Sequence, residues 1–315
     1  MSPASPQGQP GSAAVTPDAQ LGPVLAIDIG GTKMAAGVVD GAGTILGRAQ
    51  VPTPHEATAE ELFAALAGAI ESTVSSVEVA PLVCGVGCGG PMSTGGEEVS
   101  PLNIRGWRRF PLRQRLADLV GLPVFVDNDA KALALGEGWL GAASGSRNFV
   151  AMVVSTGVGG GIVIDGRLLD GEHGNAGHIG HVVVEPEGRQ CVCGGQGCLE
   201  AEASGLSIEA ATARPAAEAP LGVRVHTGTL VGRAVASVAN LLDLELAVVA
   251  GSVALGFGEP FFKAAQDEIN KRSRLDFSRS TRIIPGGLGA TGPLIGAAAI
   301  GLSGSDRGRW AGATR

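Results

Sequence analysis

The 315-residue sequence contains no tyrosine, and aromatic residues make up only 3% of it. Lys and Arg total 23 against 30 Asp and Glu, a net charge of −7, so we expect no nucleic-acid-binding surface. No run of about 18 apolar residues is present, which argues against a membrane span. Residues 1–22 lack the charged start and apolar centre of a signal peptide, and their Pro, Gly and Ser content predicts a disordered tail.

Cysteine is also scarce, with five residues in the chain. Three of them gather with one histidine in the spacing H-x9-C-x-C-x4-C, formed by His181, Cys191, Cys193 and Cys198. One imidazole and three thiolates make a full tetrahedral set for zinc and leave no open position, so we predict a structural zinc ion. A metal-type cluster without a secretory signal favours a reducing, cytoplasmic location.

Glycine, in contrast, is plentiful, with 51 residues, and hydrophobic residues make up 44% of the chain. This composition is typical of an α/β protein with many tight turns. Two stretches are built alike, LAIDIGGTKMAAGVVDGAG and VAMVVSTGVGGGIVIDGRL, each with an apolar strand, a glycine turn and an antiparallel hairpin. The duplication predicts an α/β fold of two actin-like (ribonuclease H-like) domains with a central cleft.

We place the boundary between the domains near 126–129, where an apolar strand ends. The expected parts are a tail at 1–22, a first domain at 23–127, a second domain at 128–290, a final helix near 291–303 that completes the first domain, and a flexible end at 304–315. Hydrophobic periodicity predicts the elements within these parts. Strands are expected at 24–30, 34–40, 83–88, 123–129, 149–155 and 244–252, and helices at 58–77, 111–121, 229–242, 260–272 and 291–302.

The segment DIGGTK ends the first strand with an acid, two glycines, a hydroxyl and a lysine. Backbone N–H groups on such a turn can cradle a phosphate, although an ordinary hairpin turn explains the segment equally well. The similar turn STGVGGG at 155–161 favours phosphate, because two facing turns could hold a polyphosphate, and AGS at 250–252 could meet a nucleotide. The candidate nucleotide-binding residues are Asp28, which could hold Mg²⁺ through water, Gly30, Gly31, Thr32, Lys33, Thr156, Gly157, Gly251 and Ser252.

The segment VDNDAKA places Asn128 and Asp129 at the end of an apolar strand, at the expected domain boundary. A carboxylate there can accept the proton of an attacking hydroxyl, while the neighbouring amide holds the alcohol. The alternative is a helix cap, a common use of Asn-Asp before an alanine-rich helix. The residues alone do not decide between the two, and the roles are compatible, since only one of the pair needs to cap.

Glu200, two residues after the last cysteine of the metal motif, is the other acid that we expect to face a ligand. We expect Glu202 to be an ordinary surface glutamate. His178 is either a ligand or a packed loop residue. Cys84 and Cys88 have no further metal ligands nearby, so we interpret them as buried strand cysteines.

Together these motifs resemble the ROK family of bacterial sugar kinases, repressors and related open reading frames, from about residue 24 to 302. DIGGTK resembles its first phosphate motif, GCGGP its sugar-side loop, and SPLNIRGW its PNLxGW element. VDNDAKALALGE is similar to its catalytic strand and helix. VVSTGVGGGIVIDGRLLDGEHGNAGHIGH follows the family signature, and HVVVEPEGRQCVCGGQGCLEAEASG carries its zinc motif with every ligand present.

The resemblance implies an ATP-dependent sugar kinase with Mg²⁺, in which Asp129 is the general base for the 6-hydroxyl of a hexose or N-acylhexosamine. It implies a phosphate-binding role for the two glycine turns, and homodimers as the usual state. The sugar ligands that it implies are Gly90, Asn103, Asn128, His178, His181, which would also bind zinc, and Glu200.

One departure concerns the sugar. Most sugar kinases of the family carry glutamate where this chain has His178, and AGHIGH resembles the N-acetylmannosamine kinases. We therefore expect N-acetylmannosamine to be accepted at least comparably to glucose. The alternatives are a sugar-responsive repressor, a non-catalytic sugar-binding protein, and a kinase that uses polyphosphate as donor. The repressors carry an N-terminal helix-turn-helix, and here we expect only a tail before residue 24.

Overall fold

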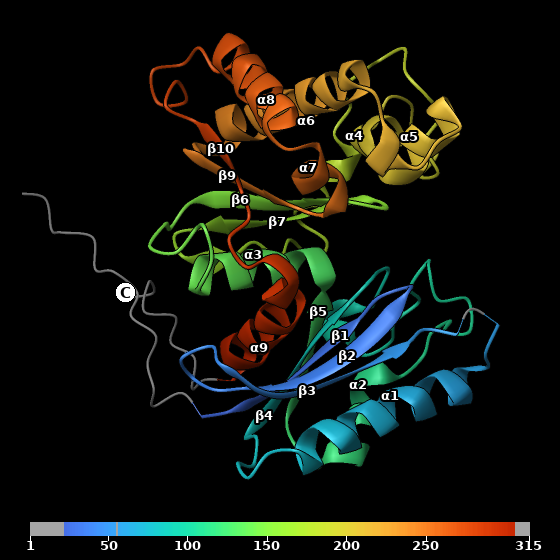
Figure 1. Cartoon of the computed structure of the whole chain (residues 1–315). Helices are drawn as coiled ribbons and strands as arrows, with labels where there is room; N and C mark the ends of the chain where they lie inside the picture. Colours follow the sequence, from blue (N-terminus) through green and yellow to red (C-terminus); the bar gives the residue numbers. More distant parts are fainter. Residues whose placement is uncertain (1–21, 55, 306–315) are drawn as a thin grey trace, which may run out of the picture.

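The computed structural model describes residues 22–54 and 56–305, and the predictions for 1–21 and 306–315 lie outside this part of the chain. Figure 1 shows two α/β halves stacked one above the other, each built on a single sheet. Within the described residues, no helix is long and apolar enough to cross a membrane.

The first sheet has the strand order β3-β2-β1-β4-β5. Its β1 pairs antiparallel with β2 and parallel with β4, and β4 pairs parallel with β5. Helices α1 and α2 pack on one face of this sheet, and α9 packs on the other (Figure 1). The bounds are β1 (Val24–Ile29), β2 (Lys33–Val39), β3 (Ile45–Pro52), α1 (Ala59–Ser75), β4 (Val83–Cys88), α2 (Leu112–Val120), β5 (Val124–Asn128) and α9 (Gly292–Gly304).

The second sheet repeats this topology, with the strand order β10-β9-β6-β7-β8. Its β6 pairs antiparallel with β7 and parallel with β9, and α3 lies against β6 and β7. The predicted duplication and actin-like fold class are therefore confirmed. The bounds are α3 (Asp129–Trp139), β6 (Phe149–Val154), β7 (Val158–Ile164), β8 (Arg167–Leu168), α4 (Leu199–Ala203), α5 (Gly205–Thr212), α6 (Leu221–Leu242), β9 (Leu246–Ala250), α7 (Ser252–Phe257), α8 (Glu259–Arg272) and β10 (Arg282–Pro285).

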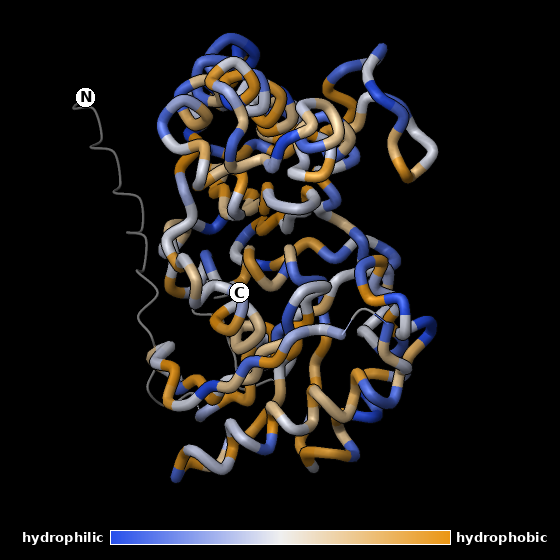
Figure 2. Tube along the Cα trace, turned by 45° about the vertical axis from the view of Figure 1, so that its right-hand side comes forward, coloured by the Kyte–Doolittle hydropathy of each residue, from blue (hydrophilic) through white to orange (hydrophobic). Residues whose placement is uncertain are grey.

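Hydrophobic residues recur along the helices and strands of both halves (Figure 2). They form separate clusters on the faces of the two sheets, because each strand buries alternate residues on opposite sides. In α1 the capping box formed by Thr58 and Glu61 fixes the start of the helix, and Leu62, Leu66 and Ile70 face the sheet.

The two halves meet where α3 crosses α9 (Figure 1). The helices approach closely because glycines stand at the crossing: a Cβ on Gly296 would lie 2.5 Å from the carbonyl oxygen of Ala132. Glu137 of α3, which is 1% exposed, accepts hydrogen bonds from the backbone N–H groups of Gly287 and Leu288, between β10 and α9. One buried carboxylate thus ties together both segments that connect the halves.

Two expectations about secondary structure need correction. Most of the expected glycine loop at 155–161 belongs to β7, so the turn is confined to residues 155–157. Helix α6 begins at Leu221 rather than near 229, although Gly and β-branched residues in its first turns disfavour a helix. Packing against α8 outweighs this propensity, since Gly228 lets the backbone of Phe261 approach. The short helices α4, α5 and α7 carry too little periodicity to be predicted.

Candidate active site

The four predicted zinc ligands converge. The ligand atoms of His181, Cys191, Cys193 and Cys198 all lie within 4.8 Å of one another. The Sγ atoms of Cys193 and Cys198 are 3.8 Å apart, as are Cys191 Sγ and His181 Nδ1. A tetrahedral zinc ion with Zn–S bonds of about 2.3 Å places two sulfurs about 3.8 Å apart. The donor set and spacing therefore fit zinc, with Nδ1 as the histidine donor.

Glu200 lies in the first turn of α4, two residues after the last cysteine of this cluster. Its Oε2 accepts a hydrogen bond of 2.9 Å from the backbone N–H of Val158, and a Cβ on Gly157 would lie 2.9 Å from the same oxygen. The carboxylate thus stands against the second glycine turn. The segment 181–198 positions Glu200, because the helix that carries Glu200 starts directly after the Cys/His cluster.

The expectation for Glu202 is wrong. This residue is 9% exposed, its carboxylate accepts the backbone N–H of Arg189, and it forms an ion pair with the Arg189 side chain. The role is structural, since it ties α4 to the segment before the cysteines. The interpretation of Cys84 and Cys88 is confirmed: both lie fully buried in β4, and burial raises the pKa of each thiol.

Asn128 and Asp129 lie at the carboxyl end of β5. Asn128 is the N-cap of α3, because its Oδ1 accepts the N–H of Ala130 over 3.0 Å. Its Nδ2 faces Gly90, where a Cβ would lie 3.6 Å away. The cap therefore uses the amide oxygen and leaves the amide nitrogen directed at the GCGGP loop. The side chain of Asp129 keeps exposed surface, yet the surrounding protein removes enough hydration to raise its pKa, while His178 lowers it.

A second carboxylate faces Asp129. Asp28, at the end of β1, has a pKa raised to about 7 by burial and by the charge of Asp129, partly offset by Lys33. Gly87 of β4 stands between the two, since a Cβ there would lie 3.8 Å from the Asp129 Cα and 4.0 Å from Asp28 Oδ1. Because β1, β4 and β5 are parallel, their carboxyl ends meet at one edge of the sheet.

The first glycine turn lies at the same edge. The N–H of Gly30 donates to the carbonyl of Lys33 over 3.0 Å, which closes the turn between β1 and β2 and leaves Thr32 and Lys33 exposed. Gly31 packs against Asn103, to whose Cβ a Cβ on Gly31 would lie 2.5 Å away. Only glycine allows this approach, which joins the DIGGTK turn to the PLNIRGW segment.

The second glycine turn meets the AGS segment of the other sheet. The hydroxyls of Ser155 and Ser252 are 2.9 Å apart, and a Cβ on Gly251 would lie 2.3 Å from the carbonyl oxygen of Val154. Thr156 is exposed at the tip of the turn. The fold therefore brings Thr156 and Gly157 beside Gly251 and Ser252, at the carboxyl ends of β6 and β9.

His178 and His181 stack with their ring centroids 6.2 Å apart and an interplanar angle of 15°. The Nδ1 of His178 lies 2.9 Å from the carbonyl oxygen of Asn175, so in the neutral ring Nδ1 carries the proton and Nε2 is an acceptor. The ring of His178 is then left with one free acceptor, Nε2, and no free donor. The charge of His178 offsets part of the rise that burial causes in the pKa of Asp129.

Sequence reasoning missed a buried group beside this site. Lys131, which is 3% exposed, pairs with Asp127 and Asp170. The spacing of four between Asp127 and Lys131 is the signal that could have shown the first pair. Asp170 is 39 residues away, and nothing local pointed to it.

Two sheets of one topology, with acids and glycine turns at the carboxyl edges of their parallel strands, define an actin-like two-domain α/β protein. The sequence model of the ROK family matches residues 24–303, and the chain therefore belongs to the ROK family. N-acetylmannosamine kinase of Citrobacter koseri is 41% identical over 250 residues, which cover 74% of this chain and 84% of that enzyme.

Solved structures agree with this assignment. ROK hexokinase from Thermus thermophilus superposes with a TM-score of 0.80 at 36% identity, covering 90% of this chain and 98% of that one. ROK family glucokinase from Streptomyces griseus, in complex with glucose and AMPPNP, superposes with a TM-score of 0.76 at 31% identity, covering 90% and 100%.

Proposed function

We propose that this chain is an ATP-dependent sugar kinase that phosphorylates the 6-hydroxyl of an aldohexose or N-acylhexosamine. Family membership and the similarity to N-acetylmannosamine kinase and glucokinase support a phosphotransferase with an alcohol acceptor. The observation that carries the proposal is the position of Asp129, which lies beside Asp28 at the edge that bears the first glycine turn.

In the proposed reaction, Asp129 accepts the proton of the sugar hydroxyl as its oxygen attacks the γ-phosphorus. The bond from the γ-phosphorus to the bridging oxygen breaks, and ADP leaves with the electron pair. Asn128 donates to the sugar through Nδ2, because its Oδ1 caps α3. The backbone of the two glycine turns, with Thr32, Lys33 and Thr156, binds the phosphates.

Mg²⁺ would neutralise charge on the phosphates, and Asp28 would hold it through water. A carboxylate whose pKa is about 7 is ionised in a useful fraction at neutral pH, and bound Mg²⁺ favours that ionised form. We therefore propose that Asp28 binds Mg²⁺ and that Asp129 contacts the sugar hydroxyl.

On the sugar side, His178, His181 and Glu200 supply the remaining ligands, joined by Gly90 and Asn103. With Nδ1 committed to Asn175, neutral His178 accepts one hydrogen bond from a sugar hydroxyl through Nε2. We propose that this change from glutamate bears on the 1- and 2-positions, so that N-acetylmannosamine is used at least as well as glucose. A coupled assay that shows strict preference for glucose in the wild type, unaltered in His178→Glu, contradicts this point.

The central experiment is an ADP-release assay over a sugar panel, with ATP or polyphosphate as donor. We expect turnover with ATP, and a loss of about 100- to 10,000-fold in kcat for Asp129→Asn. Asp118→Asn, on the exposed face of α2, is the matched control and keeps full activity. Near-normal turnover of Asp129→Asn would overturn the general-base role, and turnover with polyphosphate alone would overturn ATP as donor. We further propose a cytoplasmic homodimer, which size-exclusion chromatography with light scattering tests for the oligomer.

A further inference from the structure

Lys131 is a buried cation with three partners. It stands two residues after Asp129 in the first turn of α3, and its side chain is 3% exposed. Its Nζ lies 3.2 Å from Asp127 Oδ2 and 2.6 Å from Asp170 Oδ1, and it donates to the carbonyl of Gly174 over 3.2 Å. An ammonium group has three hydrogens, so the three acceptors account for all of them.

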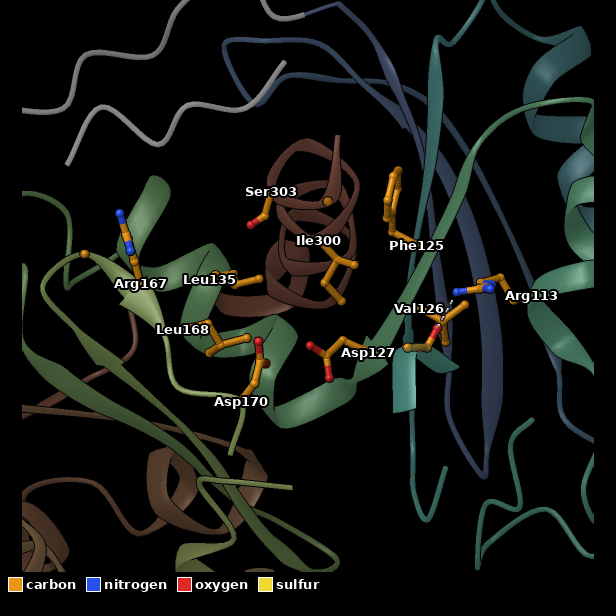
Figure 3. Close-up of a pocket in the computed structure, with 13 residues that line it drawn as sticks. Arg113, Phe125, Val126, Asp127, Leu135, Arg167, Leu168, Asp170, Ile300 and Ser303 are labelled. Carbon is orange, nitrogen blue, oxygen red and sulfur yellow. Dashed lines mark hydrogen bonds between the residues drawn. The ribbon is translucent and has the colours of Figure 1, made fainter. Parts of the chain in front are cut away.

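The partners belong to different halves of the molecule. Asp127 lies in β5 of the first sheet, and Asp170 follows β8 of the second sheet. Figure 3 shows their carboxylates lying near each other at a pocket of about 570 Å³ that both residues line. Strand β5, helix α9 and the segment after β7 form the walls of this pocket. Lys131 therefore bridges the junction of the halves.

On one side, Lys131 acts through Asp127 on Asn128 and Asp129, the two residues proposed to contact the sugar hydroxyl. Asp127 uses Oδ2 for Lys131 and Oδ1 for the backbone N–H of Asn128, which donates over 2.7 Å. The Asp127 side chain is only 25% exposed, and Lys131 is the cation that pairs with it. The cation thus fixes the backbone immediately before Asp129.

On the other side, the bridge reaches the loop that ends at His178. Lys131 contacts Asp170 at the start of this loop and Gly174 in its middle. The backbone carbonyl of Asp170 accepts a hydrogen bond from the N–H of Ala176 over 2.9 Å. The backbone carbonyl of Asn175, in the same peptide group as that N–H, contacts His178 Nδ1. The loop 170–178 is therefore fastened to α3 at two points.

We propose that Lys131 is a positioning residue that sets the affinity and choice of sugar by holding His178 at a fixed place relative to Asp129. The inference rests on the proposed sugar kinase function and deepens it. Lys131 touches neither substrate, since it is buried behind the two carboxylates. Its effect on the sugar passes through the loop 170–178.

Lys131→Met is the obvious variant, but it leaves two acids unpaired and can fail to fold. Asp170→Asn is the better probe, because Asp170 is 66% exposed and Lys131 keeps Asp127 as a partner. We expect the sugar KM to rise about tenfold, the ratio of kcat/KM for N-acetylmannosamine and glucose to change, and kcat and the KM for ATP to stay within about twofold. Asp165→Asn, in the exposed turn between β7 and β8, is the matched control and changes none of these.

Hydrogen–deuterium exchange of residues 170–178 in the whole protein gives a readout independent of activity. We expect faster exchange there in Asp170→Asn and unchanged exchange in Asp165→Asn. Unchanged exchange in Asp170→Asn overturns the fastening, and faster exchange with an unchanged sugar KM overturns the role in sugar choice. A fall in kcat at constant sugar KM overturns positioning of the sugar as well. If the wild type phosphorylates no sugar, the proposed function fails, and the exchange measurement still decides whether Lys131 holds the loop.

Discussion

Glu200 Oε2 accepts a hydrogen bond from the backbone N–H of Val158 over 2.9 Å. Glu200 lies in the first turn of α4, the helix that follows the Cys/His cluster, and Val158 is the first residue of β7, directly after the second glycine turn. This one contact joins the wall of the proposed sugar pocket to a proposed phosphate-binding turn. The proposed sugar and phosphate sites are therefore parts of a single connected unit.

Glu200→Ala should weaken the binding of both sugar and ATP. Loss of the carboxylate removes a proposed sugar ligand and leaves the Val158 N–H without its partner, at a cost of about 1–3 kcal/mol. We expect the KM values for sugar and for ATP to rise about 5- to 100-fold, with the larger rise for sugar, in steady-state kinetics. Glu209→Ala, on the exposed face of α5, is the control. An unchanged KM for ATP would show that the hydrogen bond between Glu200 and Val158 does not contribute to ATP binding.

Asp28→Asn should abolish activity and yet stabilise the fold. Because the folded-state pKa of about 7 lies above the usual 3.8, folding takes up a proton between these values, and stability falls as the pH rises from about 4 to about 7. At pH 8, without Mg²⁺, the neutral amide avoids this penalty and gains roughly 2–4 kcal/mol in the free energy of unfolding. Urea denaturation of the wild type and the variant at pH 8 and pH 4 measures this difference in the free energy of unfolding.

The gain should shrink strongly at pH 4, where the folded wild type carries neutral Asp28. Asp118→Asn, which removes an exposed charge, should show no such pH-dependent gain. A variant that is no more stable than the wild type at pH 8 would contradict the burial penalty that we assign to Asp28.

Removal of a zinc ligand should damage sugar binding rather than phosphoryl transfer. We expect Cys193→Ser to lose zinc, measured by mass spectrometry of the metal, and to raise the sugar KM at least tenfold. At saturating sugar, kcat should fall by less than about threefold. Cys84→Ala, in the buried strand β4, is the control and keeps about one zinc ion per chain. A large loss of kcat at unchanged sugar KM would place the metal in the chemistry.

The crossing of α3 and α9 should tolerate no side chain at Gly296. Gly296→Ala places a Cβ 2.5 Å from the Ala132 carbonyl oxygen and should lower the free energy of unfolding by about 1–3 kcal/mol. Gly68→Ala, on the exposed face of α1 with nothing within 4 Å of the new Cβ, should raise it by about 0.5–1 kcal/mol. Equal effects of the two changes on Tm would mean that the helix crossing relaxes freely.

Local patterns were enough wherever the deciding interaction lies close in sequence. The capped α1, the apolar strands and the zinc spacing depend on residues a few positions apart, so periodicity and ligand count revealed them. The cap of α3 by Asn128 was foreseen as one of two options, because an Asx cap needs only the next two residues. Only the structure shows that Oδ1 of Asn128 forms the cap and that Nδ2 is left for the proposed sugar contact.

The sequence by itself determined the duplicated topology, the metal cluster and the set of acids and glycine turns at the ends of the strands. Only the tertiary structure decided which of these residues face one another: Asp28 and Asp129 across Gly87, Glu200 on the turn before Val158, and Lys131 between Asp127 and Asp170. It also reversed the expectation for Glu202. The physical reason is that burial and charge pairing depend on neighbours brought together by strand order and helix packing, and those neighbours lie tens of residues apart in the chain.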